Sequence, residues 1–209
     1  MRPIIDHRRA FTLLELIVIF TVICILFALM IPATIKMRAK QKRITCVSHL
    51  KDMGLSFLMF ATDNRDYYPW QLSTNVGNLK SFEDLVPIIR GMSNEFSIPI
   101  FLNCPADTRR PAADWTGFSR TNVSYFIGLD AMRNSPNSIV AGDRNFTTNG
   151  VSVASGFVNA EKSDTAGWDG RMHRFQGMVT VGDGSVQQTS SNRFDQMIHK
   201  NATNWFVVP

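Results

Sequence analysis

The chain has 209 residues, of which 44% are hydrophobic, 11% aromatic and 19% charged, and its formal net charge is +5 at pH 7. Its 15 Phe and 4 Trp supply enough apolar material for a core, which excludes disorder throughout the chain. Three Cys are too few for a disulfide-rich miniprotein. The small excess of 22 basic over 17 acidic residues gives little support to a dedicated nucleic-acid binder.

The segment 11–31 is almost entirely apolar. Eighteen of its 21 residues are apolar, and the exceptions are Thr12, Glu15 and Thr21. As a helix it would span about 31 Å at 1.5 Å per residue, which is close to the ~30 Å hydrocarbon core of a bilayer. The segment therefore predicts a transmembrane helix.

Three membrane interpretations compete for this segment. A secretory signal peptide would have a shorter apolar run and a small-residue cleavage site, and Pro32-Ala33-Thr34 makes a poor site. A plain signal anchor fits the length but leaves Glu15 unexplained. A carboxylate in the bilayer costs at least ~2.5 kcal/mol and usually marks a specific partner. A third interpretation accounts for Glu15 as well.

The run from Arg8 to Leu16, RRAFTLLEL, resembles the type III signal of type IV pilins and type II secretion pseudopilins. This resemblance implies a cytoplasmic leader over residues 1–10, cleavage between Ala10 and Phe11 by a prepilin peptidase, and methylation of the new N-terminus. The residue before the cut is usually Gly in that family, whereas this chain has Ala10. An uncleaved anchor that shares the pattern by chance is the alternative.

The resemblance also assigns roles to two residues of the apolar segment. Glu15 becomes the fifth residue after cleavage and would pair with the terminal amine of a neighbouring subunit, setting subunit register more than adding stability. A protonated Glu15 that faces no partner is the alternative. Pro32 would kink the helix, as it does in many pilins.

A long helix is predicted from about residue 11 to residue 61. Its second half, 32–61, has apolar residues at three- and four-residue steps between polar ones, which is typical of an amphipathic helix. Two separate helices are the alternative. The polar run Asp63 to Asp66 then ends the helix.

The remainder, 62–209, is predicted to be an α+β head. A short helix is expected over 82–89, and a last helix over 193–205. Hairpins are expected at 138–157, turning at Asn149-Gly150, and at 178–188, turning at Asp183-Gly184. The predicted fold class is thus α+β and pilin-like, with a long N-terminal helix, transmembrane in its first half, on an antiparallel sheet head with short extra helices.

Further motifs are similar to those of a subgroup of prepilin-like proteins that ends in a His, nine residues and then Asp-Gly. The matching residues are Cys46, Cys104-Pro105-Ala106-Asp107, Ala141-Gly142-Asp143-Arg144, and His173 followed by Asp183-Gly184. The function of that subgroup is poorly defined, so the similarity indicates the class of protein more than its role.

Cys46 and Cys104 are candidates for a disulfide because both would lie in an oxidising compartment. A bridge between these two cysteines, 58 positions apart, would stabilise the chain by about 4 kcal/mol in the chain-entropy model. Two unpaired buried thiols are the alternative, and no metal site is expected at these cysteines. Cys24 is expected to be a small packing residue.

His173 and Asp183 are expected to be structural. If residues 174–182 are extended, the two side chains lie roughly 30 Å apart at ~3.3 Å per residue. Asp183-Gly184 is explained by its turn. No cofactor is expected; calcium is an alternative at Asp63, Asn64 and Asp66 or at Asp164, Asp169 and Gly170, although neither group has an ordered calcium-loop spacing.

The sequence carries no motif of a common catalytic site, so an enzyme is not expected. The resemblance implies a structural prepilin-like subunit of a type II secretion pseudopilus or type IV pilus-like fibre, single-pass in a bacterial inner membrane, with its head periplasmic or on an extracellular fibre. Expected partners are the prepilin peptidase, like or related pilin subunits, an inner-membrane assembly platform and membrane lipid, but not nucleic acid.

Two other functions remain open. A membrane-anchored binding protein for glycans or peptides would use exposed tryptophans, with Trp70, Trp115 and Trp168 as candidates. A DNA-uptake protein would gather Arg109, Arg110 and Arg120 on one basic face.

Overall fold

The structure is a computed structural model, and it describes residues 12–72, 85–160, 164–201 and 205–209, without the side chains of 29–36 and 201. It divides into two compact units, Met1–Gln41 and Lys42–Pro209. The predicted boundary between helix and head was residue 61, whereas the last 22 residues of the long helix, 42–63, belong to the second unit.

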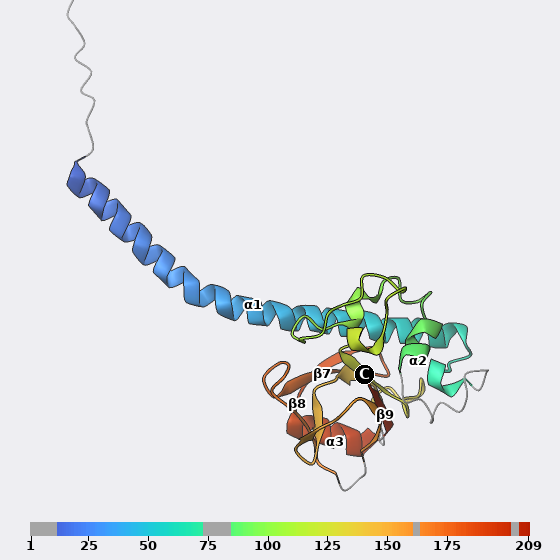
Figure 1. The fold of residues 1–209 in the computed structure, drawn as a ribbon. Helices are drawn as coiled ribbons and strands as arrows, with labels where there is room; N and C mark the ends of the chain where they lie inside the picture. Colours follow the sequence, from blue (N-terminus) through green and yellow to red (C-terminus); the bar gives the residue numbers. More distant parts are fainter. Residues whose placement is uncertain (1–11, 73–84, 161–163, 202–204) are drawn as a thin grey trace, which may run out of the picture. The chain divides into compact units, whose positions relative to one another are not determined.

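One helix, α1, runs over Leu13–Asp63 and has 51 residues (Figure 1). It begins with a capping box: the Glu15 carboxylate accepts hydrogen bonds from the Thr12 amide at 2.8 Å and the Thr12 hydroxyl at 3.1 Å, while the Thr12 hydroxyl accepts from the Glu15 amide at 3.3 Å. It ends where Arg65 and Asp66 adopt left-handed backbone angles of φ 58° and 63°.

The second unit holds two antiparallel sheets. The larger has six strands in the order β5-β9-β1-β2-β7-β8, and the smaller has three in the order β4-β3-β6. The strands are β1 Tyr125–Gly128, β2 Ile139–Asp143, β3 Phe146–Thr148, β4 Val151–Ser152, β5 Gly156–Asn159, β6 Ala166–Trp168, β7 Gln176–Val181, β8 Val186–Ser190 and β9 Trp205–Val208.

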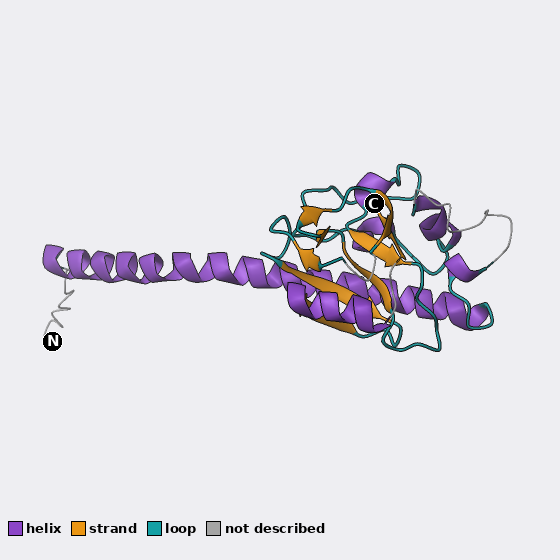
Figure 2. Cartoon of the chain, turned by 90° about the horizontal axis from the view of Figure 1, so that it is seen from below, coloured by secondary structure: helices purple, strands orange, loops and turns teal. Residues whose placement is uncertain are grey.

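The remaining helices are short. They are α2 Val86–Gly91, α3 Ser191–Asn201 and three 3-10 turns at Pro69–Gln71, Pro99–Leu102 and Arg120–Asn122. Figure 2 shows α3 lying along the larger sheet, and Phe194 and Ile198 are its buried residues. The predicted last helix ran to residue 205, but Trp205 instead begins β9, which pairs with both β1 and β5.

The larger sheet separates two apolar layers because successive side chains of a strand point to opposite faces. Tyr125 and Ile127 of β1 pack in the layer that contains the second half of α1. Phe126 packs in the other layer, with the buried residues of α3 and of the smaller sheet. The apolar side chains that α1 buries are Cys46, Leu50, Met53, Phe57 and Ala61, all with no exposed surface.

A close approach between α1 and β7 fixes how the helix lies on the sheet. A Cβ added at Gly54 would lie 2.6 Å from the Thr180 hydroxyl oxygen. Only a residue without a side chain allows this separation, so Gly54 is required by packing although it lowers helix propensity.

Both predicted turns are present. Asn149 and Gly150 have φ of 52° and 76° and connect β3 to β4, while Gly184 has φ 81° in the turn from β7 to β8. The hairpin at 178–188 is confirmed. The hairpin at 138–157 is smaller than predicted, because β2 pairs with β1 and β7 and only residues 147–148 and 151–152 pair across the turn.

In the part of the chain that the structure describes, no helix combines the length and apolar character needed to cross a membrane.

This finding corrects three predictions. The fold is a mixture of helices and antiparallel sheets, and the predicted pilin-like class with a transmembrane first half of the long helix is wrong. The predicted single-pass inner-membrane location is likewise overturned. The description of the chain as a prepilin or pseudopilin depended on that location, and so did type II secretion, N-terminal methylation and a single membrane pass. None of these has support in the structure.

Candidate functional site

The first half of α1 exposes its apolar side chains on every face. Twelve large apolar residues between Leu13 and Phe27 are between 42% and 77% exposed. Glu15 is the only charged residue between positions 13 and 35. Because monomers rarely expose apolar patches this large without a binding role, this half of the helix is one candidate functional surface.

The predicted roles of four N-terminal residues have different outcomes. Ala10 and Phe11 lie outside the described residues, and so does the side chain of Pro32, at which the helix was predicted to kink. Glu15 is described, and its carboxylate is engaged by Thr12 in the capping box. This contact explains an acid at this position from within the chain, while its pairing with a neighbouring subunit stays a prediction.

A second candidate site lies inside the second unit, where four segments bring Cys46, Cys104, Asp143 and His173 together. Cys46 is on α1, Cys104 follows the 3-10 turn Pro99–Leu102, Asp143 ends β2, and His173 lies in the loop between β6 and β7. One donor atom from each lies within 4.8 Å of the others, and all four residues are buried.

The contacts within this cluster are direct. The Cys46 thiol donates to Asp143 Oδ1 at 3.3 Å, and its sulfur lies 3.4 Å from the Tyr125 hydroxyl. Cys104 Sγ lies 3.3 Å from His173 Nε2, and that nitrogen lies 3.6 Å from Asp143 Oδ2. The Met178 amide donates to Asp143 Oδ2 at 2.8 Å.

Burial and mutual contact shift the ionisation of these groups. Burial raises the pKa of Cys46, whereas the hydrogen bond from Cys46, helped by His173, lowers the pKa of Cys104 to about 5. Burial raises the pKa of Asp143 to about 7. Burial alone would lower the pKa of His173, but its contacts with Cys104 and Asp143 raise it.

Surrounding residues hold the four side chains in place. Arg43 of α1 donates to the His173 carbonyl oxygen at 3.0 Å, in a loop where His173, Arg174 and Phe175 all have left-handed angles of φ 46° to 60°. Three such residues in a row cost about 1–2 kcal/mol each, and strained backbone of this kind is often found at functional sites.

The loop that carries Cys104 is tied down at two points. His49 Nδ1 lies 2.8 Å from the Asn103 carbonyl oxygen, and Arg144 donates to both carboxylate oxygens of Asp107 at 2.7 and 2.6 Å. The Asp107 side chain is 1% exposed. Cys104 is therefore positioned from both the α1 side and the β2 side.

The predicted disulfide between Cys46 and Cys104 is not formed in the structure, in which both are free thiols. The two residues are close together as predicted, but their sulfurs interact with Asp143 and His173 as well. The convergence of all four residues on one place was not predicted from the sequence. Two motifs could have indicated it: Cys104-Pro105-Ala106-Asp107 and Ala141-Gly142-Asp143-Arg144. Each contains one residue of the cluster, and the Asp107–Arg144 ion pair holds the two motifs together.

His173 and Asp183 are not part of one site. His173 is 7% exposed in the cluster, whereas Asp183 is exposed in the β7–β8 turn and accepts a hydrogen bond from the Ser185 amide at 2.7 Å. Gly184 supplies the left-handed residue of that turn. His173 therefore lies among side chains that can bind a metal ion, whereas Asp183 and Gly184 form a turn.

Most residues that were considered as calcium ligands interact with other side chains or with the backbone in the described structure. Asn64 donates to the Phe60 carbonyl oxygen, and Asp66 lies 3.6 Å from the Arg133 guanidinium. Asp164 accepts from Asn149, and Asp169 accepts from Ser152 and Arg171. Among the described residues, the cluster around Cys46 is the group whose donor atoms converge.

The tryptophans that were candidates for glycan or peptide binding are largely buried. Trp70 and Trp168 are 6% and 3% exposed and donate to the Ala131 carbonyl and the Thr189 hydroxyl oxygen. Trp115 is half-buried against Phe118.

Arg109 donates to backbone carbonyl oxygens of Arg120, Val123 and Pro209. Its guanidinium therefore holds chain segments together, while Arg110 and Arg120 are exposed.

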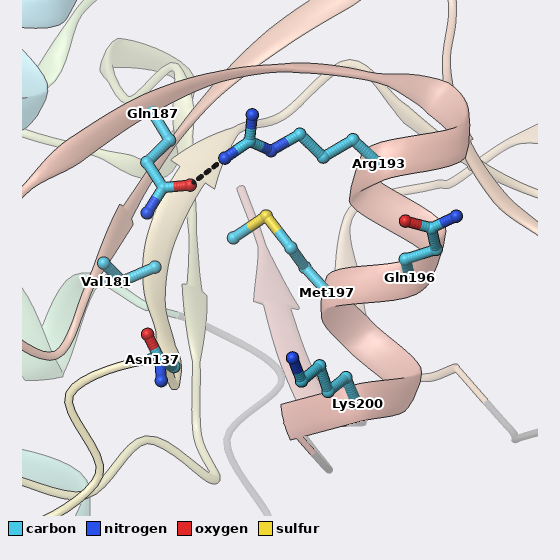
Figure 3. Close-up of a pocket in the computed structure, with 7 residues that line it drawn as sticks. All are labelled: Asn137, Val181, Gln187, Arg193, Gln196, Met197 and Lys200. Carbon is cyan, nitrogen blue, oxygen red and sulfur yellow. Dashed lines mark hydrogen bonds between the residues drawn. The ribbon is translucent and has the colours of Figure 1, made fainter.

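A surface pocket of about 320 Å³ lies between α3 and strands β7 and β8 (Figure 3). The Met197 side chain extends from α3 toward Val181 and Gln187, and the Arg193 guanidinium donates to Gln187 at 2.9 Å. The pocket is lined by Asn137, Val181, Gln187, Arg193, Gln196, Met197 and Lys200, none of which was a predicted site residue.

No protein-family model, curated protein or solved structure matches this chain.

Proposed function

We propose that this chain is a structural subunit that assembles with further copies of itself through the first half of α1. The observation that carries the proposal is the exposure of twelve large apolar side chains between Leu13 and Phe27. Each Leu, Ile, Val or Phe that becomes fully buried contributes about 1.5–3 kcal/mol, so association of these helices has a large driving force.

The distribution of these residues favours several copies over a single different partner. A partner with one groove covers one stripe of a helix, whereas this helix is apolar on every face. In a bundle of identical helices, each helix is covered by its neighbours. Glu15 is the only charge between positions 13 and 35, so the copies can pack closely along most of this length.

The basic segment that follows sets where the bundle ends. Arg38, Lys40 and Lys42 are exposed, and in a parallel bundle they would face the same residues of neighbouring copies. Like charges at this distance repel, and salt screens them. Assembly is therefore expected to strengthen as salt concentration rises.

A matched pair of substitutions tests the proposal. Ile17 and Met59 lie on the same helix and are 57% and 58% exposed. Ile17→Asp places a charge in the proposed bundle and is expected to weaken self-association at least about 10-fold, since a charge without a partner is costly in an apolar contact. Met59→Asp is expected to leave it unchanged. Sedimentation velocity of the purified full chain over a range of concentrations measures both.

Cys24 provides a second readout because it is the exposed cysteine of α1, while Cys46 and Cys104 are buried. Mild oxidation is expected to link Cys24 between copies, and Cys24→Ser should remove the product. A chain that stays a single copy at all concentrations, and whose first helix half is covered only when lipid vesicles are added, would contradict the proposal.

A further inference from the structure

Four side chains that suit a transition metal converge in the interior of the second unit. Two thiols, one imidazole and one carboxylate lie within 4.8 Å of one another, and Cys46, Cys104 and Asp143 have no exposed surface. Buried charged groups are rare unless they are paired or bind a metal ion. The cluster therefore needs a chemical explanation beyond packing.

The spacing of these donor atoms is close to that of a tetrahedral site. Zinc binds sulfur at about 2.3 Å and nitrogen or oxygen at about 2.0–2.2 Å, so neighbouring ligand atoms of a tetrahedron lie roughly 3.3–3.8 Å apart. Three of the six separations fall in or at the edge of this range: 3.3 Å from Cys46 Sγ to Asp143 Oδ1, 3.3 Å from Cys104 Sγ to His173 Nε2, and 3.6 Å from His173 Nε2 to the other carboxylate oxygen, Asp143 Oδ2. All four donor atoms lie within 4.8 Å of one another, so small shifts would complete the tetrahedron around a bound ion.

We propose that Cys46, Cys104, Asp143 and His173 bind one zinc ion. Thiolate and imidazole ligands in a four-fold set favour zinc over the hard cations calcium and magnesium, which take oxygen ligands in larger numbers. All four positions come from the protein and the site is closed to solvent. It is therefore a structural centre, because a catalytic zinc keeps one position for water or substrate.

The residues around the cluster support a preformed site. The Met178 amide donates to Asp143, Tyr125 contacts the Cys46 sulfur, and Arg43 fixes the strained loop of His173 through its carbonyl oxygen. Outer contacts of this kind orient metal ligands in known sites.

A disulfide between Cys46 and Cys104 explains less of the cluster. It would use two of the four side chains and leave the buried Asp143 beside the His173 imidazole, 3.6 Å away. A divalent cation bound by two thiolates and a carboxylate offsets two of their three negative charges. It would also tie α1, the Cys104 loop, β2 and the β6–β7 loop to one point.

Metal content and cobalt spectroscopy test the proposal on the full chain. Protein purified with reduced thiols and without chelators is expected to contain close to one zinc per chain. Replacing zinc with Co²⁺ should give the visible bands of tetrahedral cobalt together with a sulfur-to-cobalt charge-transfer band. Removing zinc should lower the midpoint of thermal unfolding and expose two additional thiols to a labelling reagent.

Matched variants separate this site from non-specific binding. His173→Asn and Cys104→Ser are expected to weaken zinc binding at least about 10-fold, the lower end of what is lost even when an outer contact is removed. Cys24→Ser removes a cysteine outside the cluster and should leave zinc content and the cobalt spectrum unchanged.

Three results would overturn the proposal. One is a folded wild-type chain with reduced thiols that takes up neither Zn²⁺ nor Co²⁺. Another is an unchanged cobalt spectrum in a chain that lacks both Cys46 and Cys104. The last is purified protein in which mass spectrometry finds these two cysteines bridged. Because the wild-type measurements stand alone, a variant that fails to fold does not affect the conclusion.

Discussion

The two halves of α1 share one helical conformation but place their apolar residues differently. In the first half, apolar side chains occupy every face and are exposed from Leu13 to Phe27. In the second half, they form a stripe at intervals of three or four residues, from Cys46 to Ala61, and this stripe is fully buried against the larger sheet. A stripe indicates a helix that the chain itself covers, whereas an apolar surface on all sides indicates a helix that other molecules cover.

Truncation of a leucine in each half should give the largest difference between them. Leu50 is 0% exposed and Leu16 is 62% exposed. Leu50→Ala is expected to lower the free energy of unfolding of the second unit by about 2–5 kcal/mol, because it removes buried apolar surface and leaves a cavity. Leu16→Ala should change it by less than about 0.5 kcal/mol. Urea denaturation followed by tryptophan fluorescence measures both, and equal losses would contradict the comparison.

The effect of replacing a helical glycine by alanine on stability should depend on what lies next to the added Cβ. Gly54→Ala is expected to lower the free energy of unfolding by about 1–2 kcal/mol, because the clash with Thr180 exceeds the gain of about 1 kcal/mol in helix propensity. Gly91→Ala is the control, since nothing lies within 4 Å of the added Cβ. In the double variant with Thr180→Ala most of the loss should disappear; a loss that persists would show that the helix does not approach the sheet this closely.

The ion pair of Asp107 and Arg144 adds a pH dependence that belongs to the second unit. Burial alone would raise the pKa of Asp107, but the hydrogen bonds from Arg144 outweigh it and lower that pKa to about 2. Because the folded-state pKa lies below the unfolded value of 3.8, the pair stabilises the fold above about pH 4.

This stabilisation should be lost as pH falls from about 4 through 2. At 1.36 kcal/mol per pKa unit, the loss is at most about 2 kcal/mol. The wild-type chain should therefore exceed Asp107→Asn in unfolding free energy at pH 5, and the difference should shrink toward pH 2. A difference that does not change with pH would mean that Asp107 carries no charge in the folded chain.

The smallest effect is expected at the start of α1. Glu15→Val removes the acceptor that caps Thr12 and should cost about 0.5–1 kcal/mol in the first turn, whereas Glu15→Gln keeps an acceptor and should cost less. Hydrogen exchange of the amides at 13–16 measures this local change. If both variants assemble like the wild type, Glu15 acts as a cap; if both fail equally, its charge is needed by a neighbouring copy.

The sequence predicted local features better than their assembly. The second hairpin was predicted because Asp183-Gly184 carries its own turn signal, and the last helix was predicted over 193–205, where Phe194 and Ile198 lie about one helical turn apart. The end of α1 at Asp63 also follows from a local polar run. Trp205 was assigned to a helix because nothing local reveals that β1 and β5 lie beside it and need a strand between them.

The buried cluster could be predicted only in part. The proximity of Cys46 and Cys104 was expected, but their pairing with Asp143 and His173 depends on where α1 crosses the sheet. That position is set by the contact of Gly54 with Thr180, and no sequence period encodes it.

By itself, the sequence determined the helical conformation of α1, the apolar character of its first half and the amphipathic stripe of its second, because these follow from the residues along the helix itself. The tertiary structure alone decided that two thiols, a carboxylate and an imidazole from four distant segments converge in the buried interior. Such convergence arises from the order of strands in the sheet and from helix packing, which are set by contacts between residues far apart in the chain.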